Sequence, residues 1–273
     1  MKSITEVLTA IPLGVTNPFF CRVDGVAHVA KWENCDEMHY PLVNEYIGYE
    51  VCKRLGVDLP SHDFVTISPE AVIQNKTDLA LCAGDLFFVS KQIRKATKFN
   101  SGAQLATVDK TKLIEMMFID VILCNTDRNE GNILLKKLPN QPVQFFAIDY
   151  SHAFYLGCLW SGQQFKRLID SPTCLKDLNQ YFHHEGYQII FSSFSFTEEE
   201  IRAVANRMKD LANQINLNEI FLSLPEKLHT LCDDVDLMLF QSFVSMRLRE
   251  IESITEDILQ YLNHISLTQP VRP

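Results

Sequence analysis

The sequence lacks paired cysteines, long apolar runs and an excess of basic charge. Its eight cysteines form no C-x-x-C pair and are scattered through apolar surroundings, as in a reduced protein. No apolar run approaches the length of a membrane-spanning helix, and residues 1–6 carry an early acid rather than a signal-peptide core. With 25 basic and 34 acidic residues, the chain is a poor general binder of nucleic acid or anionic membrane. We therefore expect a cytoplasmic protein with neither of these partners.

Internal repeats, low-complexity tracts and flexible linkers are also missing from the sequence. Of its 273 residues, 47% are hydrophobic and 22% are charged, which predicts a substantial core rather than disorder. This length suits one large domain or two lobes that share a cleft.

The hydrophobic patterns change in character near residue 93. Before it, a hairpin signal around Asp24–Gly25, a helix from Pro41 to Leu55 and strands at 63–68 and 85–90 are predicted. After it, the patterns are mainly helical, with helices at 109–124, 197–214 and 233–262 (one helix or two in tandem) and short strands at 133–135 and 143–148. The sequence therefore predicts an α+β, two-lobed fold. The N-lobe, over residues 1–92, is expected to be a small antiparallel sheet with one helix, and the C-lobe, over residues 93–273, is expected to be larger and mainly helical.

The stretch from Asn125 to Leu135, together with Phe146–Tyr150, is the most informative part of the chain. It gives Asp127, then Asn132 five residues later, and Asp149 at the end of an apolar run. An aspartate that orients an acceptor hydroxyl, with an amide and a carboxylate as oxygen ligands for Mg²⁺, is what a kinase site needs to hold Mg·ATP. Taken singly, each residue is also compatible with a polar turn or a strand end.

Lys31 and Glu45 are candidates to complete this site. Lys31 ends the second strand of the hairpin, at the expected edge of the sheet, where a lysine can reach the phosphates of a nucleotide. Glu45 follows in the first turns of the next helix and can pair with it. Without the Asp–Asn–Asp set, both would be ordinary surface residues.

A loop at 14–18 precedes the hairpin and is a candidate phosphate loop. Gly14 and the Thr16 hydroxyl could cover phosphates together with backbone N–H groups. The loop has a single glycine and no G-x-G-x-x-G pattern, so an ordinary turn explains it equally well.

Four further features have a structural and a functional interpretation. Arg128 is expected to brace the loop by pairing with a carboxylate. His152 could touch phosphate or metal, although a hydrogen-bonded structural histidine is the simpler interpretation. Cys35 and His39 have zinc-like spacing but no second pair. The run Lys91, Arg94, Lys95 and Lys98 is a solvated face or, alternatively, a docking patch for an acidic substrate.

On these residues the chain resembles the HipA-like kinases, a branch of the protein-kinase-like fold that is also similar to phosphoinositide kinases. The resemblance covers about residues 10–160 and rests on Lys31, Asn44–Tyr46, Leu59–Pro60, Asn125–Asn132 and Ile148–Tyr150. It implies an ATP- and Mg²⁺-dependent serine/threonine protein kinase. In it Lys31 binds phosphates and pairs with Glu45, Asp127 is catalytic, and Asn132 and Asp149 bind the metal.

The resemblance has three further implications. A hinge from Phe87–Val89 to Gln92–Ile93 would receive adenine through backbone groups, which makes Val89, Lys91 and Gln92 cofactor-binding candidates. Some relatives are toxins with an antitoxin partner, and some autophosphorylate in the phosphate loop, where Thr16 is the candidate here.

The sequence departs from the protein-kinase pattern at two motifs. Asn125–Thr126–Asp127 stands in place of His-Arg-Asp, and Asp149–Tyr150–Ser151 in place of Asp-Phe-Gly. The chain is also shorter than full-length toxin kinases. Two alternatives therefore stay open beside the protein kinase: a lipid or small-molecule kinase, and a non-catalytic nucleotide-binding interaction module.

Overall fold

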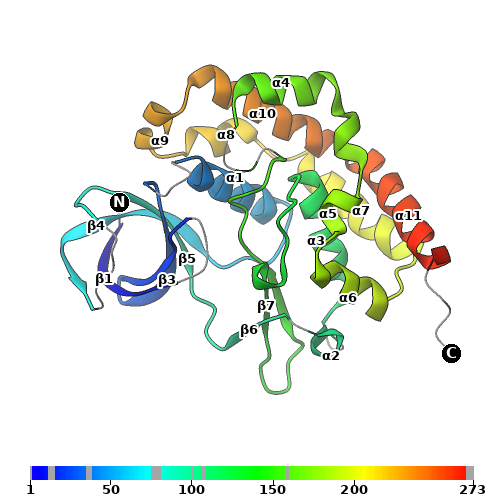
Figure 1. Cartoon of the computed structure of the whole chain (residues 1–273), viewed down its shortest axis with the longest axis horizontal. Coiled ribbons are helices and arrows are strands. Elements are labelled where there is room, and N and C mark those ends of the chain that lie inside the picture. Colours follow the sequence, from blue (N-terminus) through cyan, green and yellow to red (C-terminus); the bar gives the residue numbers. More distant parts are fainter. Residues whose placement is uncertain are drawn as a thin grey trace.

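Five strands close into a barrel at the N-terminal end of the chain (Figure 1). The computed structural model describes residues 2–11, 16–34, 39–74, 81–99, 101–105, 108–155, 157 and 160–268, without the side chains of residues 267 and 268. In the barrel the strand order is β1-β2-β3-β5-β4. The strands are β1 (Lys2–Ala10), β2 (Phe19–Val23), β3 (Val26–Trp32), β4 (His62–Ile73) and β5 (Leu86–Lys91).

The barrel corrects the prediction of a purely antiparallel sheet. β1 and β4 run parallel, with Lys2 opposite Val65 and Ile4 opposite Ile67. This pairing joins what would otherwise be the two edges of the sheet, and closure removes unpaired edge groups. It also means that Lys31 is not at a sheet edge, because β3 pairs with β2 on one side and with β5 on the other.

Helix α1 (Tyr40–Arg54) lies between the barrel and the helical part of the chain (Figure 1). Pro41 stands in its first turn, as predicted. Its buried side chains Leu42, Val43 and Ile47 belong to the large core shared with the helices of the C-terminal part, whereas the barrel interior has a separate apolar core. The helix is therefore anchored mainly to the helical part, while its Glu45 reaches the barrel lysine.

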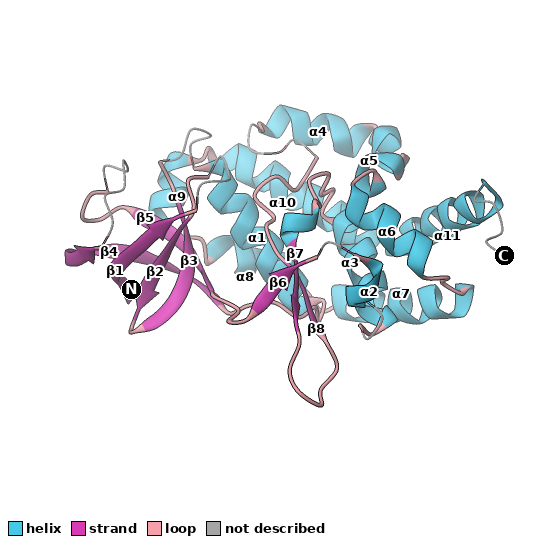
Figure 2. Ribbon diagram, turned by 60° about the horizontal axis from the view of Figure 1, so that its bottom comes forward, coloured by secondary structure: helices cyan, strands magenta, loops and turns pink. Residues whose placement is uncertain are grey.

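A second, three-stranded antiparallel sheet follows the barrel (Figure 2). Its strand order is β6-β7-β8, and the segment after β5 leads directly into it. A 3-10 turn, η1 (Glu130–Asn132), precedes the central strand, so the sheet presents the motif residues at its start. The strands are β6 (Ala96–Lys98), β7 (Ile133–Lys136) and β8 (Gln144–Ala147).

The rest of the described chain is helical, which confirms the predicted α+β class. The capping box at Thr197 and Glu200 opens a helix as predicted, and the pattern over 233–262 gives two helices that meet at Glu250. No helix among the described residues is long and apolar enough to cross a membrane. The elements are α2 (Gly102–Leu105), α3 (Lys110–Ile122), α4 (Gly162–Asp170), η2 (Pro172–Lys176), α5 (Asn179–Phe182), α6 (Glu185–Ser193), α7 (Glu198–Ala212), α8 (Leu217–Leu222), α9 (Glu226–Leu231), α10 (Asp234–Arg249) and α11 (Ile251–Thr268).

Candidate active site

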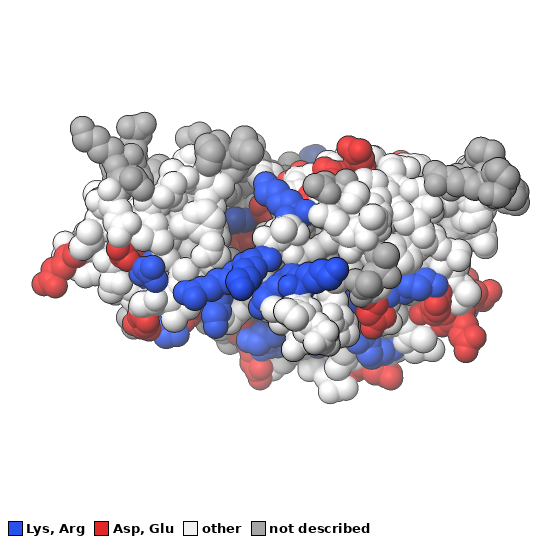
Figure 3. All heavy atoms as spheres, turned by 90° about the horizontal axis from the view of Figure 1, so that it is seen from below, with Lys and Arg blue, Asp and Glu red and all other residues white. Residues whose placement is uncertain are grey.

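A cavity of about 750 Å³ opens between the barrel and the helical part of the chain. Figure 3 looks onto this face and shows the hollow with charged side chains inside it. Its size lies within the range of small-molecule sites. Eight of the predicted site residues line it, namely Thr16, Lys31, Glu45, Lys91, Gln92, Asp127, Asn132 and Asp149.

Lys31 joins two carboxylates at the base of the cavity. Its Nζ atom lies 2.9 Å from Glu45 Oε2 and 2.7 Å from Asp149 Oδ1. The predicted pairing of Lys31 with Glu45 is thus present, and it brings together residues from β3, α1 and the end of β8. Three chain segments are tied at one ammonium group, which fixes the position of Asp149 relative to the barrel.

The charges of these three groups depend on one another. Burial opposes the charged form of Lys31, but the carboxylates of Asp149 and Glu45 outweigh it and raise the pKa of the lysine. Burial likewise opposes ionisation of Asp149, yet Lys31 and a hydrogen bond from Ser151 bring its pKa below the ordinary value. For Glu45 burial raises the pKa, while Lys31 limits the rise. The cavity therefore holds a charged lysine and an ionised Asp149.

The backbone around Asp149 is held in an uncommon conformation. Asp149 has a φ of +65°, in the left-handed region. The next amide, of Tyr150, donates to Glu45 Oε2 at 2.8 Å, and Ser151 Oγ donates to Asp149 Oδ1 at 2.6 Å. These contacts turn the chain after β8, so that the Asp149 carboxylate faces Lys31.

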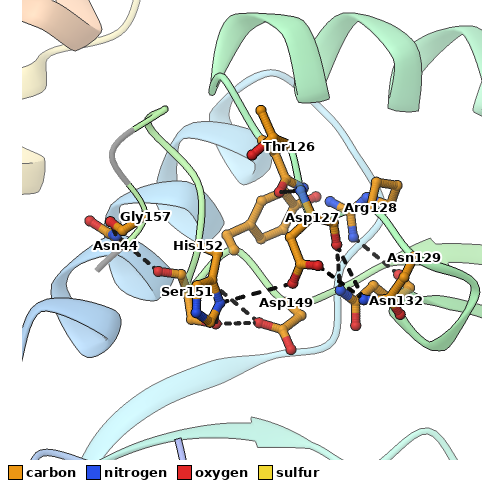
Figure 4. Close-up of polar contacts among 12 residues, drawn as sticks. Asn44, Thr126, Asp127, Arg128, Asn129, Asn132, Asp149, Ser151, His152 and Gly157 are labelled. Atoms are coloured by element: carbon orange, nitrogen blue, oxygen red, sulfur yellow. Dashed lines mark hydrogen bonds and ion pairs between the residues drawn. The ribbon is translucent and has the colours of Figure 1, made fainter. Parts of the chain in front are cut away.

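Asn44 on α1 holds the segment that follows Asp149 (Figure 4). Its amide nitrogen donates to the carbonyls of Ser151 at 2.9 Å and Gly157 at 2.6 Å, and its oxygen accepts from Trp160 at 2.9 Å. Asn44 is fully buried, and a buried amide with all these bonds made fixes its neighbours strongly. The resemblance included this residue, but no role was predicted for it.

Asp127 lies at the opening of the loop that precedes η1. Its side chain is 45% exposed, and its Oδ2 atom lies 3.9 Å from His152 Nδ1 (Figure 4). Asn129 donates to Asp127 Oδ1 at 3.3 Å, and Asn132 Nδ2 donates to the Asp127 carbonyl at 2.8 Å. The last bond orients the Asn132 amide, whose oxygen is then the group available to a metal.

Beneath the loop, Arg128 forms the carboxylate pair that the sequence predicts. Its partner is Asp120 on α3, at 2.9 Å from Nη2 to Oδ1, and both side chains are fully buried. Asp120 also accepts from Asn125 at 2.9 Å and from the Tyr187 hydroxyl at 2.6 Å. No role was predicted for Asp120, although an acid within the apolar run 116–124 is a signal of a buried, partnered carboxylate.

Gly14 and Val89 are the two remaining residues that were predicted to bind the nucleotide. Gly14 lies outside the described residues. Val89 is not part of the cavity wall: its side chain is buried in the barrel core, and β3 and β4 lie on the two sides of its backbone. Strand alternation turns the neighbouring Ser90 to the cavity instead, and the contact of adenine with backbone groups at Val89 stays a prediction.

Apolar side chains that sequence reasoning missed line the same cavity. Val29 and Phe20 come from the barrel, and Leu134 and Ile148 come from the second sheet. Single apolar residues in strands carry no sequence signal for a ligand, because most of them face a core. Cys35, the other half of the zinc-like pair with His39, lies outside the described residues.

Comparison with known proteins gives a family and a fold. A search of curated proteins found no match. Among solved structures, the proinflammatory kinase CtkA of Helicobacter pylori is similar, with a TM-score of 0.62, 10% identity, and coverage of 97% of this chain and 98% of that chain. HipA of Shewanella oneidensis MR-1 was solved with HipB and operator DNA as a toxin–antitoxin system. Its TM-score is 0.46 at 10% identity, with coverage of 91% of this chain and 67% of that chain.

At 10% identity, the similarity to CtkA concerns the fold alone. The family model is more specific, because it matches residues 4–167, which include Lys31, Glu45 and the whole Asp127–Asp149 stretch. The model also spans more than half of the sequence. The chain therefore belongs to the HipA-like kinase family.

Proposed function

We propose that this protein transfers the γ-phosphoryl group of ATP to a serine or threonine hydroxyl of a protein. The observation that carries the proposal is the bridge from Lys31 to Glu45 and Asp149 inside a cavity that also contains Asp127 and Asn132. A lysine held by a helix glutamate beside an aspartate is the arrangement that positions nucleotide phosphates in kinases.

The residues present fit Mg·ATP. Asn132 and Asp149 offer an amide and a carboxylate oxygen in one cavity, which are the hard ligands that Mg²⁺ prefers, and they would hold the metal. Lys31 would contact the phosphates, and the apolar side chains of Val29, Leu134 and Ile148 would cover the adenine ring of ATP. When bound, Mg·ATP would supply the transferable phosphoryl group and neutralise part of its charge.

Asp127 is the residue proposed to act on the acceptor. Its carboxylate is half exposed at the cavity, so an external hydroxyl can approach it, whereas Asp149 is turned to Lys31. A carboxylate there can accept a hydrogen bond from the hydroxyl and take its proton as the phosphoryl group is transferred. His152, 3.9 Å away, faces the same carboxylate and is proposed to position it.

Intact-mass spectrometry after incubation with Mg·ATP tests the reaction, and thermal unfolding with and without Mg·ATP tests binding. Asp127→Asn should retain the ATP-induced stabilisation, which is about 2.7 kcal/mol at a hundredfold excess over Kd, and lose transfer. Asp149→Asn should lose both. A phosphate-sized mass gain in the wild type alone would support kinase activity, and mapping it would test Thr16 as an autophosphorylation residue.

Other outcomes point to other functions. Equal stabilisation of the wild type and Asp149→Asn would contradict the metal assignment, and an AMP-sized gain would mean nucleotidyl transfer instead. ATP binding without any mass gain would favour an external acceptor, including a lipid or small molecule, or a non-catalytic role. An antitoxin partner stays a prediction from the resemblance.

A further inference from the structure

Five basic residues form a continuous surface beside the cavity, which we name the basic band. It consists of Lys91, Arg94, Lys95, Lys98 and Lys136. Lys91 ends β5, Arg94 and Lys95 lie between β5 and β6, and Lys98 ends β6. The antiparallel pairing of Ala96 with Lys136 brings β7 alongside. Figure 3 shows Lys and Arg side chains gathered across the middle of this face, below the hollow of the cavity.

The band differs from most other basic residues of the described chain in having no acidic partners. Within the described part of the chain, none of its five residues forms an ion pair, whereas most other lysines and arginines there do. Placing like charges together without counter-charges costs free energy, and the chain as a whole has a net charge of −9. A positive surface of this kind on an acidic protein indicates an anionic partner.

The band is continuous with the proposed catalytic site. Lys91 and Lys98 line the cavity itself, and a Cβ atom at Gly131, in the loop after Asp127, would lie 3.6 Å from Lys98 Nζ. Lys91 also lines a second, adjoining groove of about 620 Å³, together with Arg94 and Lys136. The groove also contains apolar side chains, of which Val26 is 40% exposed.

We propose that the basic band and this groove dock an acidic segment of the protein substrate, close in sequence to the acceptor hydroxyl. This inference rests on the proposed kinase function, because it assumes that the acceptor hydroxyl enters the cavity beside Lys98 and reaches Asp127. An acidic peptide matches the short run of cations and the apolar groove together. Nucleic acid is a poorer match, because its binding depends on many phosphate contacts and the rest of this chain is acidic.

Fluorescence anisotropy with two labelled peptides tests the docking without requiring turnover. One peptide has a serine flanked by aspartates and glutamates, and the other has asparagine and glutamine in their place. Arg94→Glu/Lys95→Glu changes two exposed residues that do not line the cavity. The matched control is Arg167→Glu/Arg249→Glu, which reverses two exposed charges on α4 and α10, away from the band.

The acidic peptide should bind the wild type and the control equally and the band variant about tenfold more weakly, with affinity falling as salt rises. The neutral peptide should bind none of them measurably. Unchanged stabilisation by Mg·ATP in the band variant would show that its fold and nucleotide site are intact. Equal binding of the acidic peptide to all three proteins, or stronger binding of single-stranded DNA than of the peptide, would overturn the proposal.

The two proposals can fail separately. If the band variant loses the peptide while the wild type shows no phosphate gain on the bound peptide, docking stands and the kinase reaction does not. If the wild type phosphorylates both peptides equally and the band variant does so too, the kinase reaction stands and docking does not.

Discussion

Arg128 and Asp120 form an ion pair in which neither side chain has any exposed surface. The guanidinium of Arg128 also donates to the carbonyls of Asn132, at 3.1 Å, and Ile148. These carbonyls adjoin the two proposed metal ligands, Asn132 itself and Asp149. Burial opposes the charge of Arg128, but Asp120 outweighs it and raises its pKa, so the pair stays charged. The pair therefore holds in place the backbone carbonyls that adjoin both proposed metal ligands.

Replacing Asp120 by alanine should destabilise the protein strongly. The change leaves a buried guanidinium without its counter-charge and removes the acceptor of the Tyr187 and Asn125 hydrogen bonds. Loss of one partner of a buried pair costs about 3–5 kcal/mol. Urea unfolding should report a decrease of that size in the free energy of unfolding. Glu200→Ala removes the partly exposed partner of Lys110 and one bond of the α7 capping box. It should cost less, because a surface ion pair and a cap contribute only about 1 kcal/mol each, and equal losses would contradict the role of Asp120.

The sequence predicted the parts of the site that are local in the chain. Asp127, Asn132 and Asp149 are recognised by spacing, and Lys31 and Glu45 by their place after a hairpin and within a helix. Asp120 was missed as the partner of Arg128, because the pairing depends on how α3 packs under the loop. The barrel closure by β1 and β4 was missed for the same reason.

Periodicity has a similar limit. It gave the extent of α1, α3 and α7 closely, but it gave no bounds for the short helices α4, α5, α6, α8 and α9. It also left one helix or two over 233–262, because both α10 and α11 continue the apolar pattern across Glu250. Periodicity also could not tell which side of β5 faces the cavity. Val89 and Ser90 are adjacent, and only the closed barrel determines that Val89 points inward.

Gly48 allows α1 to approach the segment after Asp149. A Cβ atom at this position would lie 2.6 Å from Tyr150 Cβ and 2.9 Å from its Cγ, closer than side chains can pack. Gly48→Ala should therefore displace Tyr150 and Asp149, although alanine usually favours helices. The apparent Kd for ATP, obtained from the ATP-induced stabilisation, should rise about tenfold. Gly186→Ala, whose Cβ would meet its nearest neighbour at 3.5 Å, should leave ATP binding unchanged. A wild-type Kd in Gly48→Ala would disprove the close-approach argument.

Glu50 should make stability depend on pH. A hydrogen bond from His62, with further bonds and charge from Lys53, lowers its pKa from 4.5 to about 2. Its contribution is therefore present above pH 4.5 and is lost as the pH falls towards 2. Since solvent screens part of the interaction, Glu50→Gln should lower the free energy of unfolding by about 1–2 kcal/mol at pH 7. The difference from the wild type should shrink between pH 4.5 and 2, and a difference that stays constant would exclude the ionised carboxylate as its cause.

Lys31→Met should separate the structural role of the lysine from its role in nucleotide binding. Without the ammonium group, the buried carboxylate of Glu45 and the carboxylate of Asp149, whose side chain is 32% exposed, lose their counter-charge. Loss of one partner of a buried pair costs about 3–5 kcal/mol, and because solvent reaches Asp149 we expect a loss towards the lower end of that range. Adding Glu45→Gln removes one of the uncompensated charges and should restore part of that stability. Mg·ATP should stabilise both variants much less than the wild type, because the cation proposed to contact the phosphates is gone. Thermal unfolding with and without Mg·ATP measures both effects.

Lys112 provides the matched control for this experiment. It also lies between two carboxylates, at 2.9 Å from Asp58 and 3.2 Å from Glu115, but it does not line the cavity. Lys112→Met should therefore lower stability and keep the full ATP-induced shift. If Lys31→Met also kept that shift, the lysine would be a structural counter-ion for Glu45 and Asp149 and not a phosphate ligand. The nucleotide would then have to be held by the other cations of the cavity wall, Lys91 and Lys98.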